Sequence, residues 1–194
     1  MLRQNQNYYR VFLKKGNAFI EDNNNITIQS NDSKVRVKTK NIIIATGAKA
    51  KKPTFLENSS NEIWSYKEAM IPNATPKSLG IVGSGAIGIE FACFYNELGT
   101  DVKVFEVQEN IVPHEDKDIS FALEKALLKK KITFYKNTKV IGLNKVESFE
   151  LTTDTKEKIE KHQFEKVLIA TGVEGNIENI GIENTKVRTK NNQI

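Results

Sequence analysis

One stretch of the chain, from Ser78 to Glu90, limits what the whole sequence can fold into. It begins with an apolar run, Leu79 to Val82, which predicts a short buried strand. Three glycines follow with the spacing Gly-X-Gly-X-X-Gly, and helical periodicity begins directly after them. A strand, a glycine-rich turn and a helix in this order are typical of a dinucleotide-binding unit.

Each glycine of this motif has a physical role in such a unit. Gly83 permits the tight turn, Gly85 lets a pyrophosphate approach the backbone, and Gly88 lets the helix pack close to the strand. The start of the helix offers free N–H groups and a positive dipole end to the phosphates. The motif by itself is a weak signal, so the prediction depends on what surrounds it.

After the motif, helices and strands alternate. The periodicity predicts a helix over 87–98, a strand over 102–106, a helix over 116–130 and a strand over 132–135. Strands joined by helical crossovers form a parallel sheet with right-handed connections. The sequence therefore predicts an α/β fold.

Each of these helices is expected to have one apolar face. On the first helix the face consists of Ile87, Phe91, Phe94 or Tyr95, and Leu98, with Gly99 at the C-cap. On the second it consists of Ile119, Leu123, Ala126 and Leu127. Acidic residues at the start of the second helix and lysines at its end suit the helix dipole.

The sequence on both sides of this unit predicts antiparallel strands. Strands are expected at 8–13, 18–20, 26–29, 35–38, 139–143 and 149–152, separated by polar turns. Continuous apolar runs at 41–47 and 166–172 both end in Ala-Thr-Gly and predict strands covered on both faces, one architectural unit used twice. The proline-punctuated connection 49–77, with a helical turn at 65–70, contains the expected domain boundary.

Composition narrows the class of protein. The formal charge of +5 comes from 29 basic and 24 acidic residues spread along the chain, without an arginine or aromatic cluster, which argues against nucleic-acid binding. We find no apolar run of about 18 residues, so no membrane span is expected. The first residues lack the apolar core of a signal peptide, and a single cysteine excludes an internal disulfide framework. These features predict a cytoplasmic protein.

Glu106 strengthens the prediction of a dinucleotide site. It ends the strand after the motif and follows Gly83 by 23 residues, near the spacing of about 20 at which an acidic side chain meets the adenosine ribose. A carboxylate here would accept hydrogen bonds from the ribose and repel a 2′-phosphate. The interpretation therefore favours NAD over NADP. The alternative is an exposed carboxylate at a strand end.

These motifs, in this order, resemble the flavoprotein disulfide reductases, and among them the dihydrolipoamide dehydrogenases. The likeness includes the glycine motif with Glu90, the Glu106 strand, the segment from Ile111-Val-Pro to Asp118, and the paired Ala-Thr-Gly runs. It covers nearly the whole chain. It implies a Rossmann-like NAD-binding domain over 76–173, with a parallel sheet and an antiparallel meander. Residues 1–75 resemble the β-rich half of an FAD-binding domain, and 174–194 a return segment toward that domain.

The resemblance also assigns cofactor contacts. For NAD it implies Gly83, Ser84, Gly85, Ala86, Ile87, Gly88, Ile89, Glu90, Glu106, Val140 and Gly172. For FAD it implies Gly16, Thr46, Gly47 and Ala48. Alternatives remain open for three of these: Val140 as a core residue, Gly16 as a turn glycine and Glu90 as a helix-surface residue.

The chain departs from the family pattern in its redox parts. A glycine motif for the FAD pyrophosphate, the redox pair of cysteines and the dimerisation domain with its acid–base histidine have no counterpart in the sequence. Cys93 is expected to be structural, and His114 and His162 to be solvated residues of a loop and of a charged turn. The sequence therefore predicts no catalytic residue and no metal site.

We expect the chain to supply the NAD-binding site and part of the FAD-binding site. It would bind NAD or NADH but would not turn over dihydrolipoamide. FAD belongs to the full-length family, and we expect little or none in this chain alone. The full-length family forms homodimers within 2-oxo acid dehydrogenase complexes, and a complementing chain would be a partner. Two alternatives stay open: another NADH-dependent flavoprotein, such as an NADH oxidase or mercuric reductase, and a non-enzymatic product of a split or decaying gene.

Overall fold

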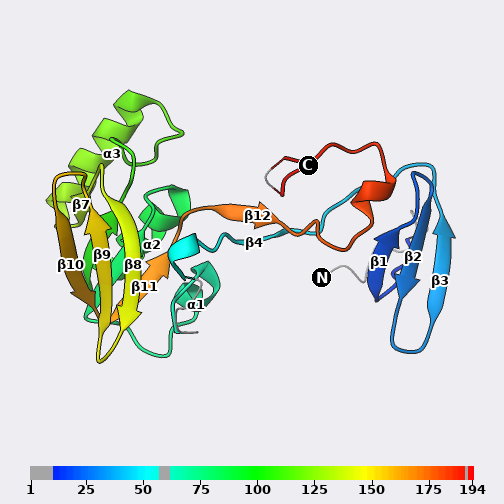
Figure 1. Ribbon diagram of the computed structural model, residues 1–194, viewed down its shortest axis with the longest axis horizontal. Coiled ribbons are helices and arrows are strands. Elements are labelled where there is room, and N and C mark those ends of the chain that lie inside the picture. Colours follow the sequence, from blue (N-terminus) through cyan, green and yellow to red (C-terminus); the bar gives the residue numbers. More distant parts are fainter. Residues whose placement is uncertain (1–10, 57–61, 191) are drawn as a thin grey trace. The chain divides into compact units, whose positions relative to one another are not determined.

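The computed structural model describes residues 11–56, 62–190 and 192–194 (Figure 1). The chain divides into two compact units, Lys49–Val173 and the combination of Met1–Ala48 with Glu174–Ile194. The two segments that connect the units contain strands β4 (Ala48–Ala50) and β12 (Val173–Gly175), which pair with each other. The domain bounds expected from the sequence, at residues 75 and 173, stay a prediction.

The larger unit is built on a parallel sheet, as the sequence predicted. Its strands lie in the order β11-β5-β6-β7. They span Ser78–Val82 (β5), Asp101–Phe105 (β6), Thr133–Tyr135 (β7) and Lys166–Ile169 (β11). All three pairings are parallel. The carboxyl ends of these strands therefore lie at one edge of the sheet.

Two hydrophobic cores lie on opposite faces of this sheet. One face packs against helices α2 (Ala86–Glu97) and α3 (Lys117–Lys129), with buried Ile89, Leu127 and strand residues. The other packs against the antiparallel meander of β8 (Lys139–Lys145), β9 (Phe149–Asp154) and β10 (Ile159–Phe164). The α/β fold is thus a parallel sheet between helices and a meander (Figure 1).

The meander approaches the sheet closely because Gly80, in the middle of β5, has no side chain. A Cβ at this position would lie 2.7 Å from Cδ2 of Phe164, whose ring is buried against Phe105 at 5.9 Å between centroids. Glycine inside a strand often marks such a close approach. Gly80 precedes the glycine motif, and no pattern in the sequence separates its role from that of the motif.

The inward faces of the two helices differ in part from those expected. On α2 the buried residues are Gly88, Ile89, Ala92 and Tyr95, so Tyr95 rather than Phe94 points inward, and Leu98 is half exposed. On α3, Leu127 and Leu123 pack inward, whereas Ile119 and Ala126 are exposed. Ile119 and Ala126 are exposed because the contact between α3 and the core is narrow. Among the described residues of α3, it includes the line of side chains Ser120, Leu123 and Leu127. Gly99, with φ of 88°, ends α2 as predicted.

A short helix, α1 (Tyr66–Met70), confirms the predicted helical turn and supports α2. Ser65 and Glu68 form a capping box at its start, which satisfies N–H groups that a helix leaves free. The buried Tyr95 hydroxyl donates to the carbonyl of Ala69 at 2.6 Å. A 3₁₀ turn, η1 (Thr54–Leu56), precedes α1. None of the helices in the described ranges is long and apolar enough to cross a membrane.

The smaller unit is an antiparallel sheet with a return segment. Strands β1 (Asn17–Ile20), β2 (Asn25–Gln29) and β3 (Lys34–Lys38) follow one another as predicted. The backbone N–H of Ile20 donates to the Ile180 carbonyl at 2.8 Å. The side-chain amide of Asn184, the last residue of the 3₁₀ turn η2 (Ile182–Asn184), donates to the Ile20 carbonyl at 2.9 Å. Residues near the C-terminus thus hold the edge of β1.

Two expected strands of this unit are wrong or only partly described. Residues 8–10 of the strand expected at 8–13 lie outside the described residues, and 11–13 are exposed and not in a strand. Residues 41–47 form no strand, and Ile43 is 92% exposed. An apolar run forms a strand only where neighbouring strands complete its hydrogen bonds. The described residues supply no such neighbour here, whereas β11 has β5.

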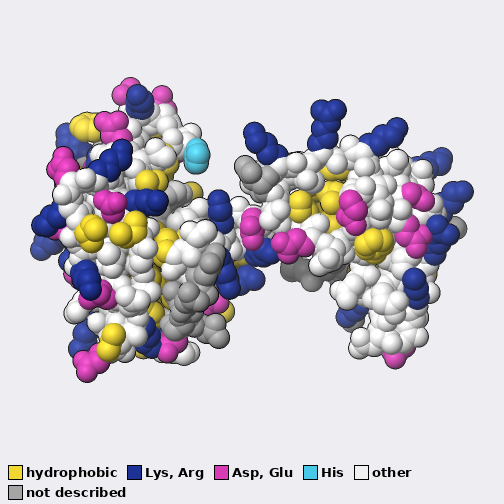
Figure 2. All heavy atoms as spheres, viewed as in Figure 1, with side chains coloured by type: hydrophobic (Ala, Val, Ile, Leu, Met, Phe, Trp, Pro, Cys, Tyr) yellow, Lys and Arg dark blue, Asp and Glu magenta, His cyan; other side chains and the backbone are white. Residues whose placement is uncertain are grey.

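Charged side chains of both signs intermix on the faces of the units seen in Figure 2. Several charged side chains pair on the surface of the molecule, for example Lys158 with Glu160 at 2.7 Å and Lys161 with Glu150 at 2.8 Å. Exposed pairs of this kind contribute little to stability, about 0–1 kcal/mol each.

His162 lies in β10, not in the charged turn expected from the sequence. Its ring packs at 4.9 Å from Tyr135 and 5.0 Å from Phe105, and Nε2 lies 3.2 Å from the Thr153 hydroxyl oxygen. Partial burial lowers the pKa of His162 below its ordinary 6.5, with Lys103 acting in the same direction and Glu160 opposing. The folded state therefore favours the neutral ring.

This pKa shift predicts a pH-dependent stability. Above pH 6.5 the ring is neutral in both states; below it the unfolded state binds the proton more readily, so the free energy of unfolding falls with falling pH. One proton limits the slope to about 1.4 kcal/mol per pH unit. Urea unfolding between pH 8 and 5.5 measures it, with His162→Gln as control. An equal pH dependence in that variant would contradict the prediction.

Candidate functional site

A cleft of about 710 Å³ opens at the carboxyl end of the parallel sheet, inside the larger unit. Its lining comes from the ends of β5, β6 and β11, the start of α2 and the loop after β6. The lining residues are Phe55, Val82, Gly83, Gly85, Ala86, Ile87, Glu106, Val107, Gln108, Pro113, His114, Val140, Ala170, Thr171 and Gly172. Ligands of open α/β sheets bind at this edge of the sheet.

The three motif glycines have three different local environments. Gly83 has φ of 102°, and its N–H donates to Phe105 at 2.8 Å, which joins the turn to β6. A Cβ on Gly88 would lie 2.1 Å from the carbonyl oxygen of Gly83, so the helix contacts the turn directly. A Cβ on Gly85 would meet no atom of the described residues within 4 Å, its chain neighbours apart. Gly83 and Gly88 thus serve the fold, and Gly85 leaves space open.

The start of α2 faces this open space. Gly85 is the N-cap residue and has no side chain to bond the first helical N–H groups. Ala86 and Ile87, which begin the helix, line the cleft. Free N–H groups and the positive end of the helix dipole favour an anion at this place. Among the described lining residues His114 alone has a side chain able to carry a positive charge, so an anion in this place would interact mainly with backbone N–H groups.

Glu106 lines the cleft and is 7% exposed, so the alternative of an exposed strand-end carboxylate is wrong. Its Oε2 accepts from the Ser84 N–H at 2.9 Å and from the Ser84 hydroxyl at 2.7 Å. Its Oε1 accepts from the Gln108 N–H at 2.9 Å. The carboxylate is therefore fixed beside the glycine turn.

The residues that the resemblance assigned to NAD separate into two groups. Gly83, Gly85, Ala86, Ile87, Glu106, Val140 and Gly172 line the cleft. Ser84, Gly88 and Ile89 are buried behind it, and Glu90 borders a separate hollow of about 280 Å³ with Ala69, Met70, Phe91 and Phe94. Val140 is both buried and part of the lining, so its two interpretations agree. The cofactor contacts themselves stay predictions.

Sequence reasoning missed the loop after Glu106 as part of the site. Gln108, Pro113 and His114 line the cleft, and the Val112 N–H donates to the Ser84 carbonyl at 2.9 Å. The available signal was topological, because a loop that follows a strand ending at the site lies at the same edge. Phe55 also lines the cleft, and its sequence context carried no such signal.

The residues assigned to FAD lie in the smaller unit. A Cβ on Gly16 would lie 2.6 Å from the Gln29 carbonyl oxygen, so packing against β2 requires glycine there. Gly47 has φ of 74°, and its carbonyl accepts from the Asn176 N–H at 2.9 Å. The Thr46 carbonyl accepts from the Asn176 side chain at 3.1 Å, and Ala48 begins β4. Their contact with FAD stays a prediction.

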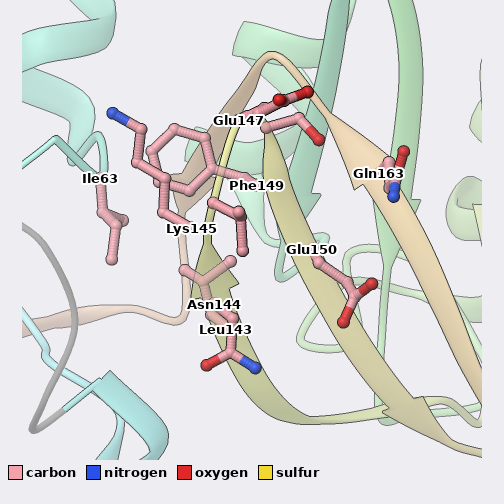
Figure 3. Close-up of a pocket in the computed structure, with 10 residues that line it drawn as sticks. Ile63, Leu143, Asn144, Lys145, Glu147, Phe149, Glu150 and Gln163 are labelled. Carbon is pink, nitrogen blue, oxygen red and sulfur yellow. The ribbon is translucent and has the colours of Figure 1, made fainter.

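A second cavity, of about 820 Å³, lies on the meander away from the motif (Figure 3). Its walls come mainly from the end of β8 and the start of β9, and Glu147, Glu150 and Lys145 line it. Lys145 pairs with Glu62 and lies 5.4 Å from the centre of the Phe149 ring. No glycine turn or helix start borders this cavity, so the cleft at Gly85 is the better candidate site.

The described residues contain no group of three or more His, Cys, Asp or Glu that could hold a metal ion. Cys93 packs against the helix-side core, and burial raises the pKa of its thiol, which disfavours the reactive thiolate. Among the titratable side chains of the described residues, only Glu106 and His114 line the cleft.

Comparison with known proteins agrees with this geometry. Residues 1–194 match the family described as pyridine nucleotide-disulphide oxidoreductase. The chain belongs to this family. The dihydrolipoyl dehydrogenase of Rhizobium etli is 42% identical over 152 residues, which are 77% of this chain and 32% of that protein. The dihydrolipoyl dehydrogenase of Zymomonas mobilis is 32% identical over 97% of this chain and 40% of that protein.

Two solved structures share the fold. The flavoprotein disulfide reductase RclA of Escherichia coli superposes with a TM-score of 0.78 and LpdA of Mycobacterium tuberculosis with 0.77. Identities are 21% and 22%, and each match covers 92% of this chain and 40% of the other. The chain thus corresponds to two fifths or less of the length of these relatives, as part of a flavoprotein oxidoreductase related to dihydrolipoyl dehydrogenase.

Proposed function

We propose that this chain is the NAD-binding portion of a dihydrolipoamide dehydrogenase-like flavoprotein. In the complete reaction, electrons pass from dihydrolipoamide to a disulfide, then to FAD, and then to NAD as hydride. In this proposal the larger unit supplies the acceptor end of that sequence, and the smaller unit supplies part of the FAD-binding domain. The 42% identity to a dihydrolipoyl dehydrogenase supports this choice over an NADH oxidase or mercuric reductase.

The observation that carries the proposal is the open space at Gly85 between the start of α2 and the Glu106 carboxylate. The open side of Gly85 suits a pyrophosphate, because no atom of the described residues beyond its chain neighbours lies within 4 Å of a Cβ built there. Glu106 lines the same cleft and is a suitable acceptor for the adenosine ribose. Apolar Val140 and Val107 would then border the adenine side of the ligand.

The chain's own residues in this proposal bind and orient the dinucleotide, and they transfer no electron. The described residues offer no cysteine pair, and Cys93 is a free thiol against the core. NAD, when bound, supplies the hydride acceptor. We therefore expect binding of NADH without turnover of dihydrolipoamide by the isolated chain, and little or no bound flavin.

Calorimetric titration of the purified chain with NADH tests the binding, with NADPH as the comparison ligand. We expect saturable binding of NADH and at least about tenfold weaker binding of NADPH, because a fixed carboxylate repels a 2′-phosphate. Absence of saturation with NADH would refute the proposal. A separate assay for lipoamide-dependent NADH formation should give no product, and product formation would refute the inactivity.

A further inference from the structure

We infer that Ser84 is a positioning residue that holds Glu106 in place and thereby sets the preference for a dinucleotide without a 2′-phosphate. This inference rests on the proposed NAD-binding function. Ser84 occupies the first variable position of the glycine motif. It is fully buried and does not line the cleft, so it acts through Glu106 rather than by contact with the ligand.

Hydrogen bonds from the protein hold both oxygens of the Glu106 carboxylate. Ser84 gives Oε2 two of them, from its N–H and its hydroxyl, and the Gln108 N–H gives Oε1 one. A carboxylate has about four acceptor positions. Protein donors within the described residues thus fill three, and the position left over, on Oε1, is available to a ribose hydroxyl.

Ser84 is itself held in place by the loop after β6. Its carbonyl accepts from the Val112 N–H at 2.9 Å. Val112 has φ of 39°, a left-handed conformation that β-branched residues rarely adopt and that surrounding contacts must impose. The Ser120 hydroxyl donates to the neighbouring Ile111 carbonyl at 2.7 Å and fixes this loop. Ser84 therefore joins the glycine turn, Glu106 and the loop after β6.

A carboxylate held in this way can set the preference for NADH over NADPH. A carboxylate already held in its bound orientation accepts a hydroxyl without losing rotational freedom, which favours the ribose of NADH. The same fixed charge cannot turn away from a 2′-phosphate, so the repulsion stays at full strength. Loss of the Ser84 hydroxyl would loosen Glu106, weaken the contact with the ribose hydroxyl and relax the repulsion.

Titration of Ser84→Ala with NADH and NADPH tests the inference. We expect the Kd for NADH to rise about five- to tenfold, as for the loss of one hydrogen bond of ordinary net strength, and the Kd for NADPH to change less than about twofold. The preference for NADH thus falls by the same factor. In a Glu106→Gln background, Ser84→Ala should change the Kd for NADH less than about twofold, because its effect passes through the carboxylate.

A matched control separates positioning from general stability. Thr100 is also buried, and its hydroxyl donates to the Pro76 carbonyl at 2.8 Å at the opposite end of the sheet. Thr100→Val should lower the melting temperature and leave the ratio of the two Kd values unchanged. Should Ser84→Ala not fold, Ser84→Cys replaces it, since a thiol is a weaker donor of similar size.

The outcomes distinguish the inference from the proposed function. If NADH binds to the unmodified chain but Ser84→Ala leaves the ratio unchanged, the positioning role is wrong and the proposed function stands. An equal loss for both ligands, or a loss that persists in the Glu106→Gln background, also overturns the positioning role. If the unmodified chain binds no NADH, both are wrong.

Discussion

Replacement of Gly88 by alanine is expected to lower the free energy of unfolding by at least about 3 kcal/mol, at the upper end of overpacking effects. The new methyl group would lie 2.1 Å from the Gly83 carbonyl oxygen and 3.4 Å from the Ala170 side chain. Gly83 cannot yield, because its N–H is bonded to Phe105 and a Cβ on it would itself meet Ala170. Helix α2 would have to leave the sheet.

Urea unfolding followed by circular dichroism measures this effect, with Gly85→Ala as the matched control. Both substitutions add one methyl group within the same motif, but the methyl at Gly85 meets no atom of the described residues beyond its chain neighbours within 4 Å. The control should unfold within about 0.5 kcal/mol of the original chain. A Gly88→Ala chain as stable as the control would contradict the close contact between α2 and the glycine turn.

Gly85→Ala is expected to have the opposite profile in a binding experiment, with unchanged stability and NADH affinity reduced more than about a hundredfold, or about 2.8 kcal/mol. Its methyl group would occupy the space into which a pyrophosphate must move to reach the N–H groups of α2. The backbone tolerates the change, because Gly85 has an extended conformation, φ −67° and ψ −179°, that alanine adopts easily.

Calorimetric titration with NADH at one salt concentration measures this loss. The control here is Gly142→Ala, in β8, where a Cβ would have ordinary contacts of 3.6 Å and 3.7 Å with the Thr152 side chain, away from the cleft lining. That variant should bind NADH as the original chain does. Full affinity in Gly85→Ala would mean that the pyrophosphate does not lie against this turn.

The two glycine variants together separate fold from function inside one motif. The spacing Gly-X-Gly-X-X-Gly does not distinguish the roles of the three glycines. The atoms that surround them in the structure do differ. Gly83 and Gly88 contact each other and Ala170, whereas Gly85 faces the cleft. A loss of function at Gly88 would therefore report a loss of structure, and only Gly85 isolates the site.

The sequence predicted the parts of the fold that depend on local pattern. The apolar run before Gly83, the helical periodicity after it and the next strand were sufficient for β5, α2 and β6. Capping residues also predicted helix ends correctly, since serine favours the start of a helix and glycine its end. Ser65 lies at the start of α1 and Gly99 at the end of α2. The alternating runs likewise predicted β2 and β3.

Predictions were less accurate where the structure of a segment depends on contacts with another part of the chain. Two apolar runs end in Ala-Thr-Gly, but only the second forms a strand, because β5 lies beside it and no described strand lies beside 41–47. Likewise Ile119 and Ala126 have the spacing of a buried face and are exposed, because the sheet contacts only a narrow stripe of α3. Periodicity states which residues share a face, not how much of it is covered.

The sequence by itself determined the class of this protein and the presence of a dinucleotide motif, since glycine spacing and a strand-end carboxylate are local in the chain. Only the tertiary structure decided what each residue of that motif does. Folding brings Glu106 to the Ser84 hydroxyl at 2.7 Å and the Val112 N–H to the Ser84 carbonyl at 2.9 Å. Those bonds join three segments, and a linear pattern carries no information about which donor will reach which acceptor.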